Sequence, residues 1–174
     1  MRRSFRIYYK ALDRVTFLID LLITCHPQGF GVLLGTAPVP DSRMIHDMMS
    51  TQRVGMPDDF KPATRSNETE AERIVYDRDY FDEAVKMAGG WEHIHKVVGE
   101  YKEADSRTWG VAVDHVKYVS NSASRYESKL GYVATKHGLS PRTVTKYRKE
   151  FPTKLAYAVL MPEADREDFH LIPG

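Results

Sequence analysis

Residues 129–151 read KLGYVATKHGLSPRTVTKYRKEF, and this stretch decides the fold that we predict. It divides at Gly138 into two helical segments joined by a tight turn, because glycine readily adopts the left-handed conformation that ends a helix. Ser140 is a favourable N-cap, and Pro141 suits the first helical position, where an N–H group has no helical partner. We therefore predict a helix, a turn and a second helix that ends before Pro152.

The second helical segment has two different faces. Val144, Tyr147 and Phe151 share one face, and we expect them to pack on the first segment, where the small Ala134 permits a close approach. Arginine and lysine bind guanine edges and phosphates, and threonine binds phosphates or the thymine methyl group. The opposite face contains only side chains of these types and no carboxylate. It consists of Arg142, Thr145, Lys146 and Lys149.

Residues 128–151 resemble the helix-turn-helix of bacterial and phage DNA-binding proteins. The run Gly138-Leu-Ser-Pro-Arg-Thr-Val144 is similar to the turn and the start of the recognition helix in LuxR-type response regulators, sigma-factor region 4 and many transposases. Gly131 departs from the pattern, because glycine inside the supporting helix costs roughly 1 kcal/mol relative to alanine. The resemblance implies that double-stranded DNA is the partner and that Arg142, Thr145 and Lys146 read bases. The DNA-binding residues that we predict are Ser140, Arg142, Thr143, Thr145, Lys146, Arg148 and Lys149.

The distribution of charge favours the same function. The 174 residues include 25 Lys or Arg and 24 Asp or Glu, so the net charge of +1 gives no indication of a nucleic-acid partner. Between Val116 and Lys154, however, there are nine basic residues and only two acidic ones, both glutamates, which gives a net charge of +7. The rest of the chain has 16 basic and 22 acidic residues, a net charge of −6. A concentration of positive charge of this kind is typical of phosphate binding.

The apolar stretch near the start of the chain has the pattern of a buried amphipathic helix. Residues 15–25 are too few to cross a membrane, which needs about 20, and charged residues interrupt the region where an export signal would be apolar. The single cysteine, Cys25, excludes an intramolecular disulfide and favours a reducing compartment, so we expect a cytoplasmic protein. The apolar residues at helical spacing are Leu12, Val15, Leu18, Ile19, Leu22 and Ile23.

The predicted domains are separated by a linker at residues 56–67, which are rich in proline and polar residues. A helical N-terminal domain, 1–55, precedes the linker, and its last helix begins at Asp41 or Ser42 and runs to about Arg53. The second domain, 68–174, is predicted to be a helical bundle that ends in the helix-turn-helix. The fold class is therefore mainly α.

Helices in the second domain are indicated by caps and breaks. Asn67 and Glu70 have capping-box spacing, and the helix that they begin stops at the pair Gly89-Gly90. Two further helical patterns start at Trp91 and at about Ser106. We expect these helices to support the helix-turn-helix.

The N-terminal domain has a second, shorter resemblance. Ala11-Leu-Asp-Arg14, the helix 18–23, His26-Pro-Gln-Gly29 and the helix that ends before Gly55 are ordered like the winged-helix start of IclR-type regulators. This resemblance implies a winged-helix-like domain that also contacts DNA. The alternative is a helical packing or dimerisation domain, because residues 54–66 lack the alternation that a wing strand needs.

Candidate catalytic and metal-binding residues are few. His93 and His95 are two positions apart on a helix and point to nearly opposite sides, so we expect structural roles for both. A local acidic run on one helix is usually a solvated face, and Cys25 at the end of an apolar helix is expected to be inert. We therefore predict no enzyme activity, cofactor or metal. The acidic run consists of Asp77, Asp79, Asp82 and Glu83.

The function that the sequence favours is sequence-specific DNA binding by a bacterial or phage transcription regulator. We expect a homodimer or higher homo-oligomer, because such modules commonly gain affinity by joining two half-sites. One alternative is a DNA-recognition accessory of a transposase, recombinase or terminase, which a large ring-like oligomer would favour. Another is an interaction module that binds RNA polymerase through its basic helix.

Overall fold

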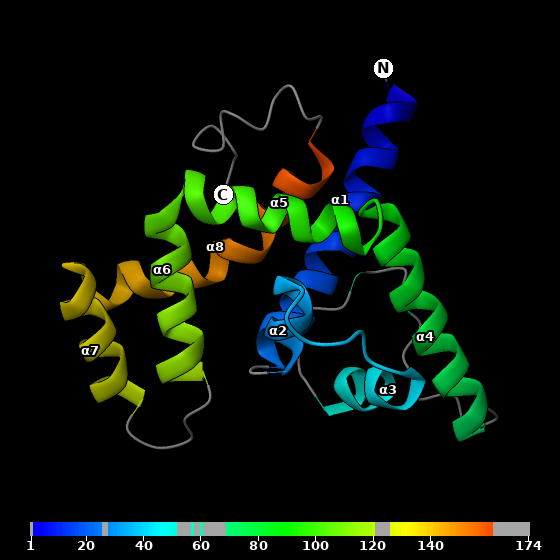
Figure 1. Ribbon diagram of the computed structural model, residues 1–174, viewed down its shortest axis with the longest axis horizontal. Helices are drawn as coiled ribbons and strands as arrows, with labels where there is room; N and C mark the ends of the chain where they lie inside the picture. Colours follow the sequence, from blue (N-terminus) through cyan, green and yellow to red (C-terminus); the bar gives the residue numbers. More distant parts are fainter. Residues whose placement is uncertain are drawn as a thin grey trace.

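The computed structural model describes residues 2–25, 28–51, 57, 60, 69–120 and 126–161, and every regular element in these ranges is helical. The predicted mainly α fold is confirmed. Figure 1 shows the elements and their order. Their bounds are α1 Arg2–Thr24, α2 Gln28–Leu34, α3 Ser42–Thr51, α4 Glu70–Met87, α5 Trp91–Ala104, α6 Ser106–Asp114, the π-helix η1 His115–Ser120, α7 Tyr126–His137 and α8 Pro141–Leu160.

The main hydrophobic core forms where α1 packs on α2, α4 and α8. All six apolar residues of α1 that recur at helical spacing are at most 7% exposed, so the predicted buried amphipathic helix is confirmed. Leu155, Ala156 and Val159 of α8 belong to the same core. The two ends of the described chain are therefore held together by one apolar interior. No helix among the described residues is both long enough and apolar enough to cross a membrane.

The two predicted domains share this core. Phe60, which lies within the predicted linker 56–67, packs on Phe17 of α1 and Tyr80 of α4 at ring-centroid distances of 6.2 and 4.9 Å. Apart from Pro57 and Phe60, the linker lies outside the described residues. Helices on both sides of it, α1 and α4, are in direct contact.

The helix starts follow from local capping. The side chain of Asp41 accepts a hydrogen bond from the Met44 N–H at 2.9 Å, which confirms the predicted start of α3. Helix α4 is capped by Thr69, whose hydroxyl accepts from the Glu72 N–H at 3.2 Å. The prediction of Asn67 as this cap was wrong, because the closer threonine makes the capping bond; Asn67 itself lies outside the described residues. The predicted stop at Gly89-Gly90 is confirmed, and both glycines have positive φ.

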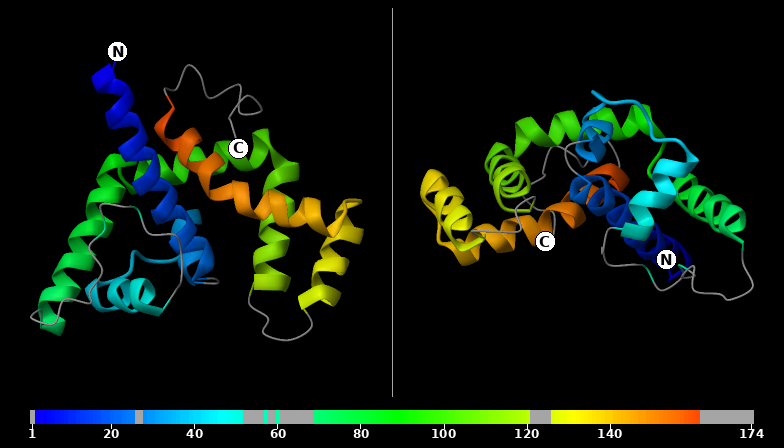
Figure 2. Two further views of the ribbon diagram at one scale, coloured as in Figure 1. Left: turned by 180° about the vertical axis from the view of Figure 1, so that it is seen from behind. Right: turned by 90° about the horizontal axis from the view of Figure 1, so that it is seen from below.

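The prediction that the second helix ends before Pro152 was wrong. Helix α8 continues through Pro152 to Leu160, and it changes direction along its length (Figure 2). Proline inside a helix costs about 3 kcal/mol, because it supplies no N–H to the carbonyl four residues earlier. Burial of Leu155 and Val159 against the main core contributes about 1.5–3 kcal/mol for each side chain. Tertiary packing therefore keeps the chain helical beyond the proline.

Candidate nucleic-acid interface

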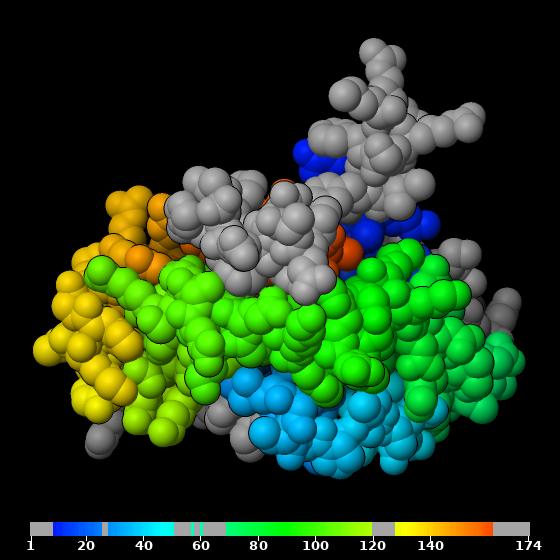
Figure 3. Space-filling view, turned by 45° about the horizontal axis from the view of Figure 1, so that its top comes forward, coloured from blue at the N-terminus to red at the C-terminus, as the bar shows by residue number. Residues whose placement is uncertain are grey.

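A small three-part unit forms one end of the molecule. It consists of α6 with η1, then α7, then the first half of α8, and α7 lies at the edge of the molecule in Figures 1 and 3. These elements enclose a second hydrophobic core, separate from the main one. Its buried members are Val111, Val119, Leu130, Val133, Ala134 and Val144, and Tyr118, Leu139 and Tyr147 pack against them.

The turn between α7 and α8 has the predicted geometry. Gly138 has φ of 64°, in the left-handed region, and the Leu139 N–H donates to the Ala134 carbonyl at 2.9 Å. These features end α7 and place Leu139 against the small core. Helix α8 then starts at Pro141, with Ser140 as its N-cap. The helix, turn and helix predicted from the sequence are therefore all present.

The first half of α8 has one buried and one exposed face, as predicted. Val144 and Phe151 are fully buried, and Tyr147 is partly buried. Phe151 also contacts Trp109 of α6 edge to face, with ring centroids 5.6 Å apart. This contact fixes the rotation of α8 about its axis. The opposite side, which we call the cationic stripe, consists of the exposed residues Arg142, Thr145, Lys146 and Lys149.

One carboxylate borders the cationic stripe. Glu150, which is partly buried, lies with its Oε1 atom 4.0 Å from Nζ of Lys146. Both residues line a surface hollow of about 690 Å³ along this side of α8. The Thr145 hydroxyl donates to the Pro141 carbonyl at 3.2 Å. Glu150 therefore reduces the positive potential at one point of an otherwise cationic surface.

Two of the predicted DNA-binding residues are engaged in the helix cap. The Ser140 Oγ atom accepts from the Thr143 N–H at 3.2 Å and lies 2.8 Å from the Thr143 hydroxyl. Both residues remain at the N-terminus of α8, beside the cationic stripe. A helix N-terminus favours anions through its free N–H groups and its dipole.

Arg148 is set apart from the other predicted residues. Its side chain is only 15% exposed and turns toward α1, where Nη2 lies 3.5 Å from Oδ1 of Asp20. The cationic stripe therefore brings together four of the seven predicted residues, with Ser140 and Thr143 at its start. This ion pair could not be predicted from local sequence patterns, because its partners are 128 positions apart.

A carboxylate that the sequence analysis missed ties α7 to α6. Asp114 Oδ2 lies 3.0 Å from Nζ of Lys136 and 2.7 Å from Nε2 of His137. Burial opposes ionisation of this carboxyl, but the hydrogen bonds from Lys136 and His137 hold the pKa of Asp114 below its ordinary value. The hydrogen bond to Asp114 also raises the pKa of Lys136. These contacts hold the end of α7, and hence the turn, in place.

Other candidate residues have structural contacts. His93 and His95 place their Nε2 atoms 2.8 and 2.9 Å from the carbonyl oxygens of Val159 and Val32, and so join helices. No group of three potential ligands for a metal occurs among the described residues. Burial raises the pKa of Cys25 to about 11, which keeps its thiol protonated at neutral pH.

The predicted acidic run does not converge on one point. Asp77 is buried and lies 2.7 Å from Nδ1 of His46 on α3. Asp79, Asp82 and Glu83 are exposed, and Asp82 and Glu83 form ion pairs with Arg78 and Arg14. Asp77 therefore joins α4 to α3, and the other carboxylates occupy the surface of α4.

Comparison of the chain with protein families, with curated proteins and with solved structures gives no match. The function must therefore be inferred from the chain's own geometry. The feature with the clearest chemical meaning is the cationic stripe, held on a rigid helix opposite a buried face.

Proposed function

We propose that the chain is a sequence-specific DNA-binding protein that inserts the first half of α8 into the major groove. The observation that carries this proposal is the cationic stripe, which lies opposite the fully buried Val144 and Phe151. A helix oriented in this way presents Arg142 and Lys146 to base edges and Lys149 to a phosphate. Packing on α6 and α7 supports the helix, so that the stripe keeps its position during binding.

The dimensions of the stripe agree with this docking. An α-helix with its side chains is about 10–12 Å across and fits the major groove, which is about 12 Å wide; from Arg142 to Lys149 the helix advances about 10 Å along its axis. That length matches about three base pairs at 3.4 Å each. Three base pairs specify a site poorly in a genome, so we propose that two copies bind two half-sites as a homodimer or higher homo-oligomer. The role that we propose is transcription regulation in a bacterium or phage.

The experiment that tests this function is selection of bound sequences from random double-stranded DNA with the full chain. The winning sequence is then titrated at several salt concentrations with the wild type, Arg142→Ala and Lys149→Ala. We expect Arg142→Ala to cost about 1–3 kcal/mol of binding free energy and to relax one base position. Lys149→Ala should weaken all sequences alike and reduce the salt slope by about one.

A matched control is Lys86→Ala, because Lys86 is an exposed lysine in the last turn of α4, outside the unit formed by α6, η1, α7 and the first half of α8. This variant should bind as the wild type does. If Arg142→Ala and Lys149→Ala leave the affinity unchanged, or if Lys86→Ala reduces it equally, then α8 is not the DNA-binding helix.

The same selection separates the alternative functions. Binding in a large ring without a preferred half-site spacing would favour a DNA-recognition accessory of a transposase, recombinase or terminase. An interaction module would be favoured by two results together. No DNA would be selected, and the chain would bind RNA polymerase in a way that is lost on charge reversal at Arg142 and Lys146. Retained polymerase binding after that reversal would contradict the interaction module.

A further inference from the structure

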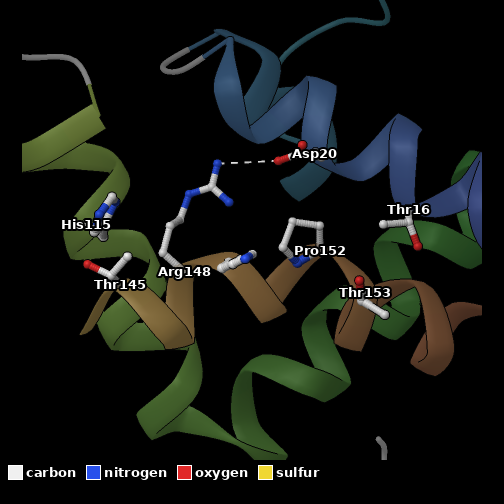
Figure 4. Close-up of a pocket in the computed structure, with 8 residues that line it drawn as sticks. Thr16, Asp20, His115, Thr145, Arg148, Pro152 and Thr153 are labelled. Carbon is white, nitrogen blue, oxygen red and sulfur yellow. Dashed lines mark hydrogen bonds and ion pairs between the residues drawn. The ribbon is translucent and has the colours of Figure 1, made fainter. Parts of the chain in front are cut away.

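An open cavity of about 420 Å³ adjoins the cationic stripe. It lies between α1, η1 and α8 and is open to solvent, and Figure 4 shows its lining. The Arg148 side chain extends across the cavity toward Asp20 on α1 (Figure 4). A volume of this size is within the range of small-molecule sites. The other lining residues are Thr16, His115, Thr145, Lys149, Pro152 and Thr153.

Two polar atoms of the lining residues have no hydrogen-bond partner in the part of the chain that the structure describes. The Nε atom of Arg148 and the Oγ1 atom of Thr16 are both buried without a hydrogen bond among the described residues. Arginine has five N–H donors, and the contact to Asp20 at 3.5 Å engages only one nitrogen. A buried polar group without a partner is energetically unfavourable, and a bound ion or water molecule is one explanation for such a group in a native protein.

The charges around the cavity favour an anion. Arg148 and Lys149 supply two positive charges, and Asp20 supplies the one carboxylate in the lining. Burial raises the pKa of Asp20, and Arg148 opposes this shift. Burial, together with the charge of Arg148, lowers the pKa of His115 to about 4, so its imidazole is neutral at physiological pH. The charged side chains of the lining therefore sum to +1, and the lining also contains three threonine hydroxyl groups.

We propose that this cavity is a binding site for a phosphate-type oxyanion, with Arg148 as its principal donor. The Thr16 hydroxyl and the Lys149 ammonium would complete the contacts, and the anion would compete with Asp20 for the guanidinium. Arginine binds such oxyanions through two parallel N–H groups, and the Nε atom provides the second donor that the pair with Asp20 leaves unused.

The oxyanion has two sources, a free phosphorylated small molecule or a phosphate of the DNA backbone. Thr145 and Lys149 belong both to the cavity lining and to the cationic stripe. The site therefore adjoins the surface that is proposed to meet DNA, and the second source rests on the proposed function. In either case, occupation of the site engages Lys149.

The site is tested by titrating the amide chemical shifts of the full chain with inorganic phosphate, using sodium chloride of equal ionic strength as the reference. We expect saturable shifts around Asp20, His115 and Arg148. The affinity should fall at least about tenfold in Arg148→Gln, which removes a charged donor, and roughly two- to tenfold in Thr16→Val. The matched control is Arg142→Gln, because Arg142 lies on the cationic stripe outside the cavity lining.

Shifts that do not saturate, or an equal loss of affinity in Arg142→Gln, would overturn the site, because diffuse attraction would then explain the binding. Should Arg148→Gln fail to fold, Thr16→Val decides, since it removes one buried hydroxyl without a change of shape. Unchanged phosphate affinity in Thr16→Val would in that case reject the site.

The source is assigned by DNA titration in phosphate-free buffer. Unchanged DNA affinity of Arg148→Gln assigns the site to a free anion. Weaker binding with a salt slope reduced by about one assigns it to a backbone phosphate. If no DNA sequence is selected at all, the proposed function fails, while the phosphate titration still decides the existence of the site.

Discussion

Replacing Gly138 by alanine tests the turn on which the orientation of α8 depends. Gly138 has φ of 64°, and an added Cβ would meet no described atom within 4 Å. The substitution therefore introduces backbone strain without a collision. An L-residue in the left-handed conformation costs about 1–2 kcal/mol. We expect Gly138→Ala to lower the free energy of unfolding by about 1 kcal/mol.

The same substitution at Gly131 should have the opposite effect. Gly131 lies inside α7, and a Cβ there would also meet no described atom within 4 Å. Alanine loses less conformational entropy than glycine when a helix forms, so Gly131→Ala should raise the free energy of unfolding by about 0.5–1 kcal/mol. The two variants add the same methyl group to α7 and to the turn that follows it, which makes each the control of the other.

The measurement is urea-induced unfolding followed by far-ultraviolet circular dichroism, with the slope of free energy against urea compared among the three proteins. Equal slopes mean that the midpoints report stability alone. Stabilisation by both substitutions would refute the assigned conformation of the turn, and destabilisation by both would refute the helical environment assigned to Gly131. A Gly138→Ala protein as stable as the wild type would also refute the assigned conformation of the turn.

Two further predictions concern the carboxylates of this unit. Because the folded-state pKa of Asp114 lies below its ordinary value, the ionised carboxylate stabilises the fold above that value and loses this contribution as the pH falls through the folded-state pKa. Asp114→Asn should therefore lower stability at neutral pH, and urea unfolding at about pH 3 should show a smaller difference from the wild type. Glu150→Gln removes the carboxylate beside Lys146 and should raise DNA affinity roughly two- to fivefold at low salt. Binding measured across salt concentrations should show this gain fading, and a gain independent of salt would exclude an electrostatic cause.

The helices α7 and α8 and the turn between them could be predicted because their determinants are local in the sequence. The left-handed Gly138, the Ser140 cap and Pro141 lie within four positions, and each acts on its immediate neighbours. The two faces of α8 follow from the helical period alone, since Val144 and Phe151 are seven positions apart. The buried face of α1 could be predicted for the same reason.

The remaining features depend on contacts between residues far apart in the chain. Arg148 is basic like the residues of the cationic stripe, but its side chain turns toward Asp20 on α1. Pro152 has the local character of a helix end, yet Leu155 and the residues that follow find an apolar partner in α1. The pairing of His137 with Asp114 joins two helices across 23 positions. Local propensity carries no information about such partners.

The ion pairs of Arg148 and Lys136 also affect how the net charge of +7 between Val116 and Lys154 is interpreted. Lys136 and Arg148 belong to the nine basic residues of that segment, and both contact carboxylates that lie outside it, Asp114 and Asp20. The local sum therefore overstates the charge available to phosphates. On the exposed side of α8 the cations are Arg142, Lys146 and Lys149, and Glu150 borders one of them. Counterion release scales with the number of phosphates neutralised, so the three exposed cations allow α8 a salt slope no steeper than about −3 per protomer. Nine free cations would give a far steeper slope.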